Sequence, residues 1–151
     1  MRDKPGEQLS TEGITLARPI GSNTGPFGLV VTSPAHRAIE TAVAMGFAVN
    51  ETMCALSELP TDMLLKTGWP ATFARHRNSA REYRDVEAFA HKQANTWKDI
   101  ANKVEDGERA LLVVHGLFIE MGAIGIFGTI APTRVGPCSR LLRGLSFYAR
   151  Q

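Results

Sequence analysis

The stretch LVVTSPAHRAIETA at residues 29–42 limits the possible folds of this chain more than any other. It opens with an apolar, mostly β-branched run, which is typical of a buried strand. Ser33 then suits the N-cap of a helix and Pro34 its first position, where a missing N–H costs nothing. Apolar residues follow at helical spacing, at Ala35, Ile39, Ala42 and Val43, before a suitable stop at Gly46. The stretch therefore predicts a strand, a tight turn and a helix in direct succession.

A second unit of the same kind lies further along the chain. Residues 110–114 are apolar on both faces, as in a strand inside a parallel sheet, and an apolar helix is expected over 117–127. Other patterns predict two more helices: one from Ser10 that is short or kinked at Pro19, and one over 84–106 with an Asp99–Lys103 pair. They also predict a short strand at 47–49 and an edge strand at 145–149. Helices that alternate with apolar strands indicate a layered α/β fold, which we expect to form one domain over 1–151.

Composition narrows the classes of function. The net charge of +2 is too small to indicate a nucleic-acid partner. No apolar run reaches the roughly 20 residues that a membrane span needs. Cys54 and Cys138 are far apart without metal-type spacing, and we expect buried or idle thiols in a reducing, cytoplasmic compartment. The sequence therefore predicts no nucleic-acid partner, no membrane, no metal and no cofactor.

Polar residues stand at the carboxyl ends of both apolar strands, the edge at which open α/β sheets bind ligands. Arg37 falls in the first turn of a helix, where a cation opposes the helix dipole, and this misfit favours a functional role. Its guanidinium matches phosphate or carboxylate. His115 can donate a hydrogen bond or, when protonated, neutralise an anionic oxygen, although a lone histidine at a strand end is more often structural. Gly116 lets a ligand approach the backbone closely.

Three segments carry a family resemblance. Residues 32–42, TSPAHRAIETA, resemble the S-S-P-x-x-R-A-x-x-T-A segment of the histidine phosphatase superfamily, the phosphoglycerate mutase-like proteins. Residues 9–13, LSTEG, resemble the L-[ST]-x-x-G helix start of that family, and residues 113–116, VVHG, resemble its V-V-x-H-G segment. The three occur in the order found in the family. The resemblance implies a three-layer fold with a mostly parallel sheet and helices on both faces.

The resemblance also implies a reaction. Members of the family transfer a phosphoryl group to a histidine at the end of the first strand, and then to water or another hydroxyl. By position, Arg37 would bind the phosphate oxygens and His115 would be the second histidine of the pocket. The substrate would be a small phosphorylated compound, or the ligand inorganic phosphate. A carboxylate would protonate the leaving oxygen; Glu58 is the candidate, with Asp62 and Glu51 as rivals.

The sequence departs from the family at the nucleophile. Only residues 1–8 precede Leu9, without an apolar strand, and Asp3 stands where the family's histidine would be. We therefore expect a truncated or naturally inactive framework whose phosphatase or phosphomutase activity is impaired unless the missing strand is supplied. Without that central strand, two apolar strands would have unpaired edges. This predicts a rearranged sheet, or a homo-oligomer formed by strand exchange.

A second interpretation is a non-catalytic interaction module, a pseudophosphatase. Its contact surface would be the basic segment from Arg75 to Arg84, which contains Arg75, His76, Arg77, Arg81 and Arg84. The same residues would also be expected on an ordinary solvated face, or on a rim that attracts an anionic substrate.

Overall fold

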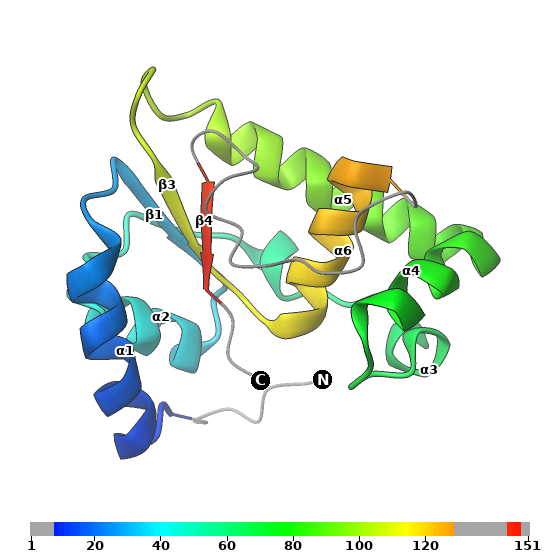
Figure 1. Cartoon of the computed structure of the whole chain (residues 1–151), viewed down its shortest axis with the longest axis horizontal. Coiled ribbons are helices and arrows are strands. Elements are labelled where there is room, and N and C mark those ends of the chain that lie inside the picture. Colours follow the sequence, from blue (N-terminus) through cyan, green and yellow to red (C-terminus); the bar gives the residue numbers. More distant parts are fainter. Residues whose placement is uncertain (1–7, 129–144, 149–151) are drawn as a thin grey trace.

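Four parallel strands in the order β2–β1–β3–β4 form the sheet of the computed structural model, which describes residues 8–128 and 145–148 (Figure 1). They are β1 (Leu29–Thr32), β2 (Glu51–Thr52), β3 (Ala110–Val113) and β4 (Leu145–Tyr148). Both predicted apolar strands are confirmed, and β4 lies at the edge of the sheet as predicted. The strand predicted at 47–49 is wrong, because pairing with β1 begins only where Val31 meets Glu51.

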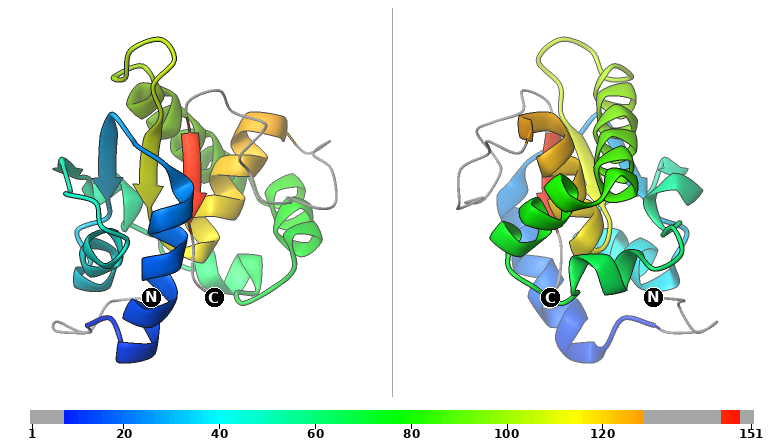
Figure 2. Two further views of the ribbon diagram at one scale, coloured as in Figure 1. Left: turned by 60° about the vertical axis from the view of Figure 1, so that its left-hand side comes forward. Right: turned by 90° about the vertical axis from the view of Figure 1, so that its right-hand side faces the viewer.

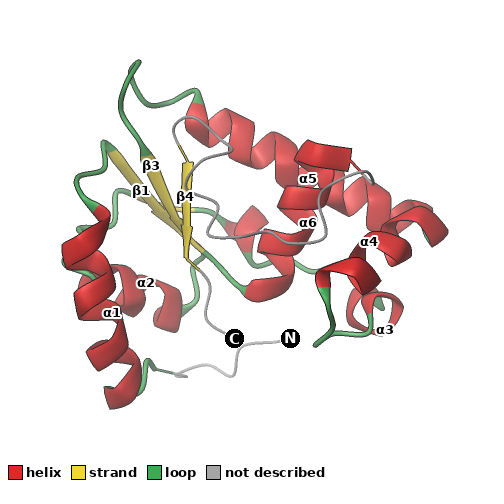
Figure 3. Cartoon of the chain, in the orientation of Figure 1, coloured by secondary structure: helices red, strands yellow, loops and turns green. Residues whose placement is uncertain are grey.

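Helices cover both faces of the sheet (Figures 2 and 3). Helices α1 (Thr11–Thr24) and α2 (His36–Ala44) lie on one face, and α5 (Arg84–Ala101) and α6 (Gly116–Phe127) lie on the other. The turn η1 (Cys54–Leu56) and the helices α3 (Met63–Thr67) and α4 (Phe73–Glu82) connect β2 to α5. The predicted α/β class is therefore confirmed. Within the described ranges, no helix has the length and apolar character that crossing a membrane requires.

The alternation of the strands divides the core in two. Val30 and Leu111 point toward α1 and α2, whereas Val31 and Leu112 belong to the larger cluster under α5 and α6. All of these side chains are buried, as expected for parallel strands that are covered on both faces. Val43, which the sequence places on the buried side of α2, is 61% exposed, so that part of the prediction is wrong.

Two glycines allow α5 and α6 to pack closely. A Cβ atom on Gly122 would lie 2.1 Å from Cζ2 of Trp97, and one on Gly125 would lie 2.1 Å from the carbonyl oxygen of Ala90. Neither space could hold a methyl group without movement of the neighbouring helix. The apolar character of α6, with buried residues around most of its circumference, fits this close contact.

Helix α1 passes through Pro19, although the sequence predicts a short or kinked helix there. Ser10 caps the helix as predicted, since its hydroxyl accepts a hydrogen bond of 3.1 Å from a backbone N–H of the first turn. Polar side chains in the last turns donate to carbonyl groups one turn earlier, Ser22 to Arg18 at 3.1 Å and Asn23 to Pro19 at 2.7 Å. The helix nevertheless continues to Thr24, past the residue that lacks an N–H.

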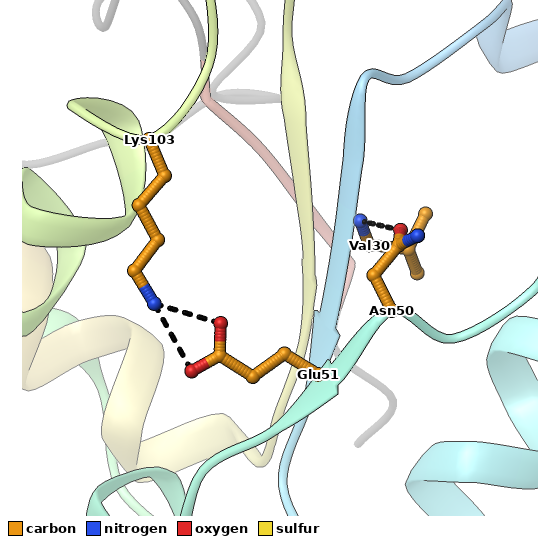
Figure 4. A network of polar contacts seen from close by, with 4 residues as sticks. All are labelled: Val30, Asn50, Glu51 and Lys103. Atoms are coloured by element: carbon orange, nitrogen blue, oxygen red, sulfur yellow. Dashed lines mark hydrogen bonds and ion pairs between the residues drawn. The ribbon is translucent and has the colours of Figure 1, made fainter.

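Helix α5 ends before residue 106, its predicted end. The N–H of Lys103 donates to the carbonyl of Ile100 at 3.1 Å. This bond spans three residues, where the α-helix spans four, so it makes a tighter turn that ends the helix. The ammonium group of Lys103 lies 2.7 Å from the carboxylate of Glu51 on β2 (Figure 4). The predicted pair with Asp99 is therefore wrong.

The strands β1 and β3 have hydrogen-bonded neighbours on both sides. They pair with each other directly, and the outer neighbours are β2 and β4. These two strands therefore have no unpaired edges in the described sheet. Of the two predicted outcomes, direct pairing of β1 with β3 agrees with a rearranged sheet, and the homo-oligomer stays a prediction. Residues 1–7, where the departure at the nucleophile falls, lie outside the described residues.

Candidate functional site

The carboxyl ends of β1 and β3 lie side by side. The register pairs Thr32 with Val113, and the N–H of Ser33 donates to the carbonyl of Val113 at 3.2 Å. From these two ends the chain enters α2, which carries Arg37 in its first turn, and α6, which His115 precedes. Nη2 of Arg37 lies 3.4 Å from Nδ1 of His115. The structure therefore brings the guanidinium and imidazole groups together, as an anion site at this edge requires.

Hydrogen bonds determine the tautomer of His115. A guanidinium can only donate, so Nδ1 of His115 accepts from Arg37. In the neutral ring Nε2 then carries the proton, and it lies 3.0 Å from Oγ of Ser33. A chain of donors thus runs from Arg37 through His115 to Ser33.

The sequence predicts Ser33 as the N-cap of α2, and this is wrong. Ala35 holds the N-cap position, and α2 begins at His36 rather than at Pro34. The physical reason is that Ser33 still belongs to the sheet through its backbone N–H, while its fully buried hydroxyl faces His115. The only signal for this role in the sequence is a serine directly after one apolar strand and a histidine directly after the other.

A serine bonded to a histidine also occurs in hydrolases, where the serine attacks the substrate. In those enzymes Nε2 must be free to accept the serine proton, and a carboxylate accepts from Nδ1–H. Here a donor, Arg37, occupies the position of that carboxylate, and this arrangement favours the tautomer with the proton on Nε2 of His115, the opposite of what a general base requires. Ser33 is also fully buried. This geometry does not support Ser33 as a nucleophile.

Both helices at the site begin without a side-chain cap. Ala35 precedes α2 and His115 precedes α6, and neither side chain makes a capping hydrogen bond. The first N–H groups of a helix have no acceptor within the helix, and the helix dipole adds partial positive charge there. Two such ends beside a guanidinium are an environment that favours a multivalent anion.

The sequence suggests that a ligand approaches the backbone at Gly116, but in the structure the side chain of Trp69 does so. A Cβ atom on this residue would lie 2.3 Å from Cη2 of Trp69, so the indole ring rests against the backbone at the start of α6. The predicted close approach is real, but it is made by an aromatic side chain of the same chain. Trp69 thus lies next to the site, against the start of α6, and the sequence reasoning missed it.

The three candidate acids have different surroundings in the structure. Glu58 is exposed on the segment after η1, and the described residues give its side chain no hydrogen bond or ion pair with Arg37 or His115. Glu51 is engaged with Lys103 at 3.0 and 2.7 Å (Figure 4), on the edge strand β2. Asp62 is exposed and has the left-handed backbone that precedes α3, with φ of 61°.

One further carboxyl was missed. Glu120 lies in α6, about one turn after Gly116, and its Oε2 atom is buried without a hydrogen-bond partner among the described residues. Burial raises the pKa of this carboxyl to about 7. It is the only ionisable residue of the apolar run 117–127, a signal in the sequence that could have identified it.

The basic segment divides on folding. His76 is fully buried, and burial lowers its pKa, so it does not belong to a charged surface. Arg75, Arg81 and Arg84 are exposed, and the acidic residues Glu82, Asp85 and Glu87 are exposed among them. The predicted contact surface therefore has mixed charge, and the interaction module stays a prediction.

Of the two states predicted for the cysteines, buried or idle, burial is wrong for Cys54, which is a free, exposed thiol; Cys138 lies outside the described residues. Among the residues that the structure describes, no group of at least three histidine, cysteine, aspartate or glutamate side chains could hold a metal ion. No family model, curated protein or solved structure matches the chain.

Proposed function

We propose that this chain is a phosphoglycerate mutase-like member of the histidine phosphatase superfamily, and that it serves as a phosphate-binding framework for hydrolysis or transfer of phosphomonoesters. One observation carries the proposal: Arg37 and His115 converge at the ends of the adjacent parallel strands β1 and β3. The resemblance of residues 32–42 and 113–116 to the family's segments supports it. The parallel α/β sheet is compatible with it.

Each group has a distinct task with a phosphate in place. The guanidinium of Arg37 binds two phosphate oxygens as a fork, which a flexible ammonium could not do as well. His115, protonated at both nitrogens, neutralises a third oxygen through Nδ1 while Nε2 stays bonded to Ser33. The N–H groups at the starts of α2 and α6 add partial positive charge. Stabilising charge on the phosphoryl group is the main part of catalysis in such reactions.

The described residues lack a second histidine at this place. His36 and His91 are exposed, and His76 is buried against Trp69. The part of the chain that the structure describes therefore has no group positioned beside Arg37 and His115 to form a phosphohistidine. We expect binding of phosphate with impaired turnover.

Calorimetric titration with inorganic phosphate tests the proposal. The chain should bind phosphate saturably, and Arg37→Ala should weaken binding about 100-fold, since charge-assisted hydrogen bonds contribute about 1.5–3 kcal/mol each. Arg18→Ala is the matched control, because it removes an exposed arginine from α1 and should leave the affinity unchanged. If Arg37→Ala binds phosphate as well as the unmodified chain, the site is wrongly assigned.

A further inference from the structure

Trp69 forms a wall at the start of α6. Its six-membered ring lies against Gly116, the residue that directly follows His115. A Cβ atom on Gly116 would lie only 2.3 Å from Cη2 and 2.9 Å from Cζ2 of the ring, too close for any side chain. Trp69 is partly exposed, so the ring is not simply part of the closed core. A group that extends from a phosphate held by Arg37 and His115 along the start of α6 would therefore meet the indole.

The indole is held from behind by His76. The two rings are nearly parallel, with an interplanar angle of 21° and centroids 5.7 Å apart. His76 has no exposed surface, and burial lowers its pKa, so its neutral form supports the indole. Gly68, with φ of +69°, ends α3 and lets the chain turn directly into Trp69. The wall is thus rigid, and it does not depend on a charged partner.

A rigid aromatic side chain beside an anion site favours anions that carry an aromatic ring. An aromatic ring placed on it gains dispersion and ring–ring interaction, and an aliphatic chain gains less because it has no ring to pair with the indole. Because Trp69 is already fixed, no side-chain entropy is lost when the ring of a ligand meets it.

We propose that Trp69 makes the site selective for phosphomonoesters of aromatic alcohols over phosphomonoesters of aliphatic polyols. The inference rests on the proposed function, because it needs the phosphate at Arg37 and His115. It assigns the substrate class of that site to aryl phosphates, with Trp69 as the residue that determines specificity.

Titration of the whole chain with inorganic phosphate, phenyl phosphate and glycerol 3-phosphate tests the assignment. Phenyl phosphate should bind about 3- to 10-fold more tightly than glycerol 3-phosphate, as expected for an aromatic pair. Trp69→Leu should remove this preference and leave the affinity for inorganic phosphate within about twofold. Trp69→Phe should keep part of the preference. Circular dichroism of each variant checks that the fold is retained.

Fluorescence gives a second, independent measurement. The chain has two tryptophans, and Trp97 is buried between α5 and α6. Phenyl phosphate should change the emission of the unmodified chain but not that of Trp69→Phe. Equal affinities for the two esters, or a preference that persists in Trp69→Leu, would overturn the role of Trp69 alone. Failure of inorganic phosphate to bind the unmodified chain would overturn the phosphate site as well.

Discussion

Replacing Glu120 by glutamine tests whether the carboxyl inside α6 is neutral in the folded protein. Its Oε2 atom is buried without a hydrogen-bond partner among the described residues, and burial raises its pKa from 4.5 to about 7. The folded chain therefore keeps a proton that the unfolded chain releases. Glutamine has nearly the same shape and no charge, so it reproduces the protonated state at every pH.

The sign and size of the effect follow from that pKa. Because the folded value is the higher one, the favourable contribution is fully present below pH 4.5 and is lost as the pH rises through about 7. A pKa difference of one corresponds to about 1.4 kcal/mol, so the rise gives at most about 3 kcal/mol. The side chain is only partly buried, and water reduces the expected loss of stability to about 2 kcal/mol.

Urea unfolding at about pH 5 and about pH 8 measures the difference in free energy. Glu120→Gln should be more stable than the unmodified chain by about 2 kcal/mol at the higher pH, with most of this gain absent at the lower pH. Glu105→Gln, at an exposed position after the end of α5, is the control and should show no comparable pH-dependent difference. A Glu120→Gln variant with the same relative stability at both pH values would refute the argument.

Three other outcomes are expected. Gly122→Ala should destabilise the protein by about 1–3 kcal/mol in urea unfolding, because its methyl group would overlap Trp97; an unchanged midpoint would contradict the close α5–α6 contact. Ser33→Ala should cost about 1–3 kcal/mol in the same assay and should weaken phosphate binding, since it removes the acceptor for Nε2 of His115. Calorimetry with sulfate in two buffers of different ionisation enthalpy should show proton uptake on binding, and His115→Asn should abolish it; uptake that persists in the variant would place the proton elsewhere.

The strands and their meeting point could be predicted from the sequence because both depend on short-range pattern. An apolar run such as 110–114 can be stable only between two covering layers, and parallel neighbours bring Arg37 and His115 to one edge. The burial of the strands and the confirmed cap at Ser10 follow from the same local rules.

The rest depends on partners that are distant in sequence. From the sequence alone, Ser33 resembles a helix cap. In the structure its hydroxyl lies beside His115, which is 82 positions away in the sequence. The ring of Trp69 stands in the space of a Cβ on Gly116, and no spacing rule connects these two residues. Pro19 is a helix breaker by local propensity, yet α1 continues through it to Thr24.

The chain of hydrogen bonds from Arg37 through His115 to Ser33 explains why a hydroxyl, and not a carboxylate, suits position 33. In the proposed phosphate complex, a dianion bound to Arg37 would take the guanidinium away from Nδ1 of His115, because that contact, at 3.4 Å, is the longer of the two. Nδ1 must then gain a proton, or its lone pair would face an anionic oxygen. Ser33 accepts from Nε2 before and after this change, so it holds the ring without competing for the new positive charge. A carboxylate there would favour the imidazolium without any anion bound, and part of the attraction for phosphate would be neutralised inside the protein.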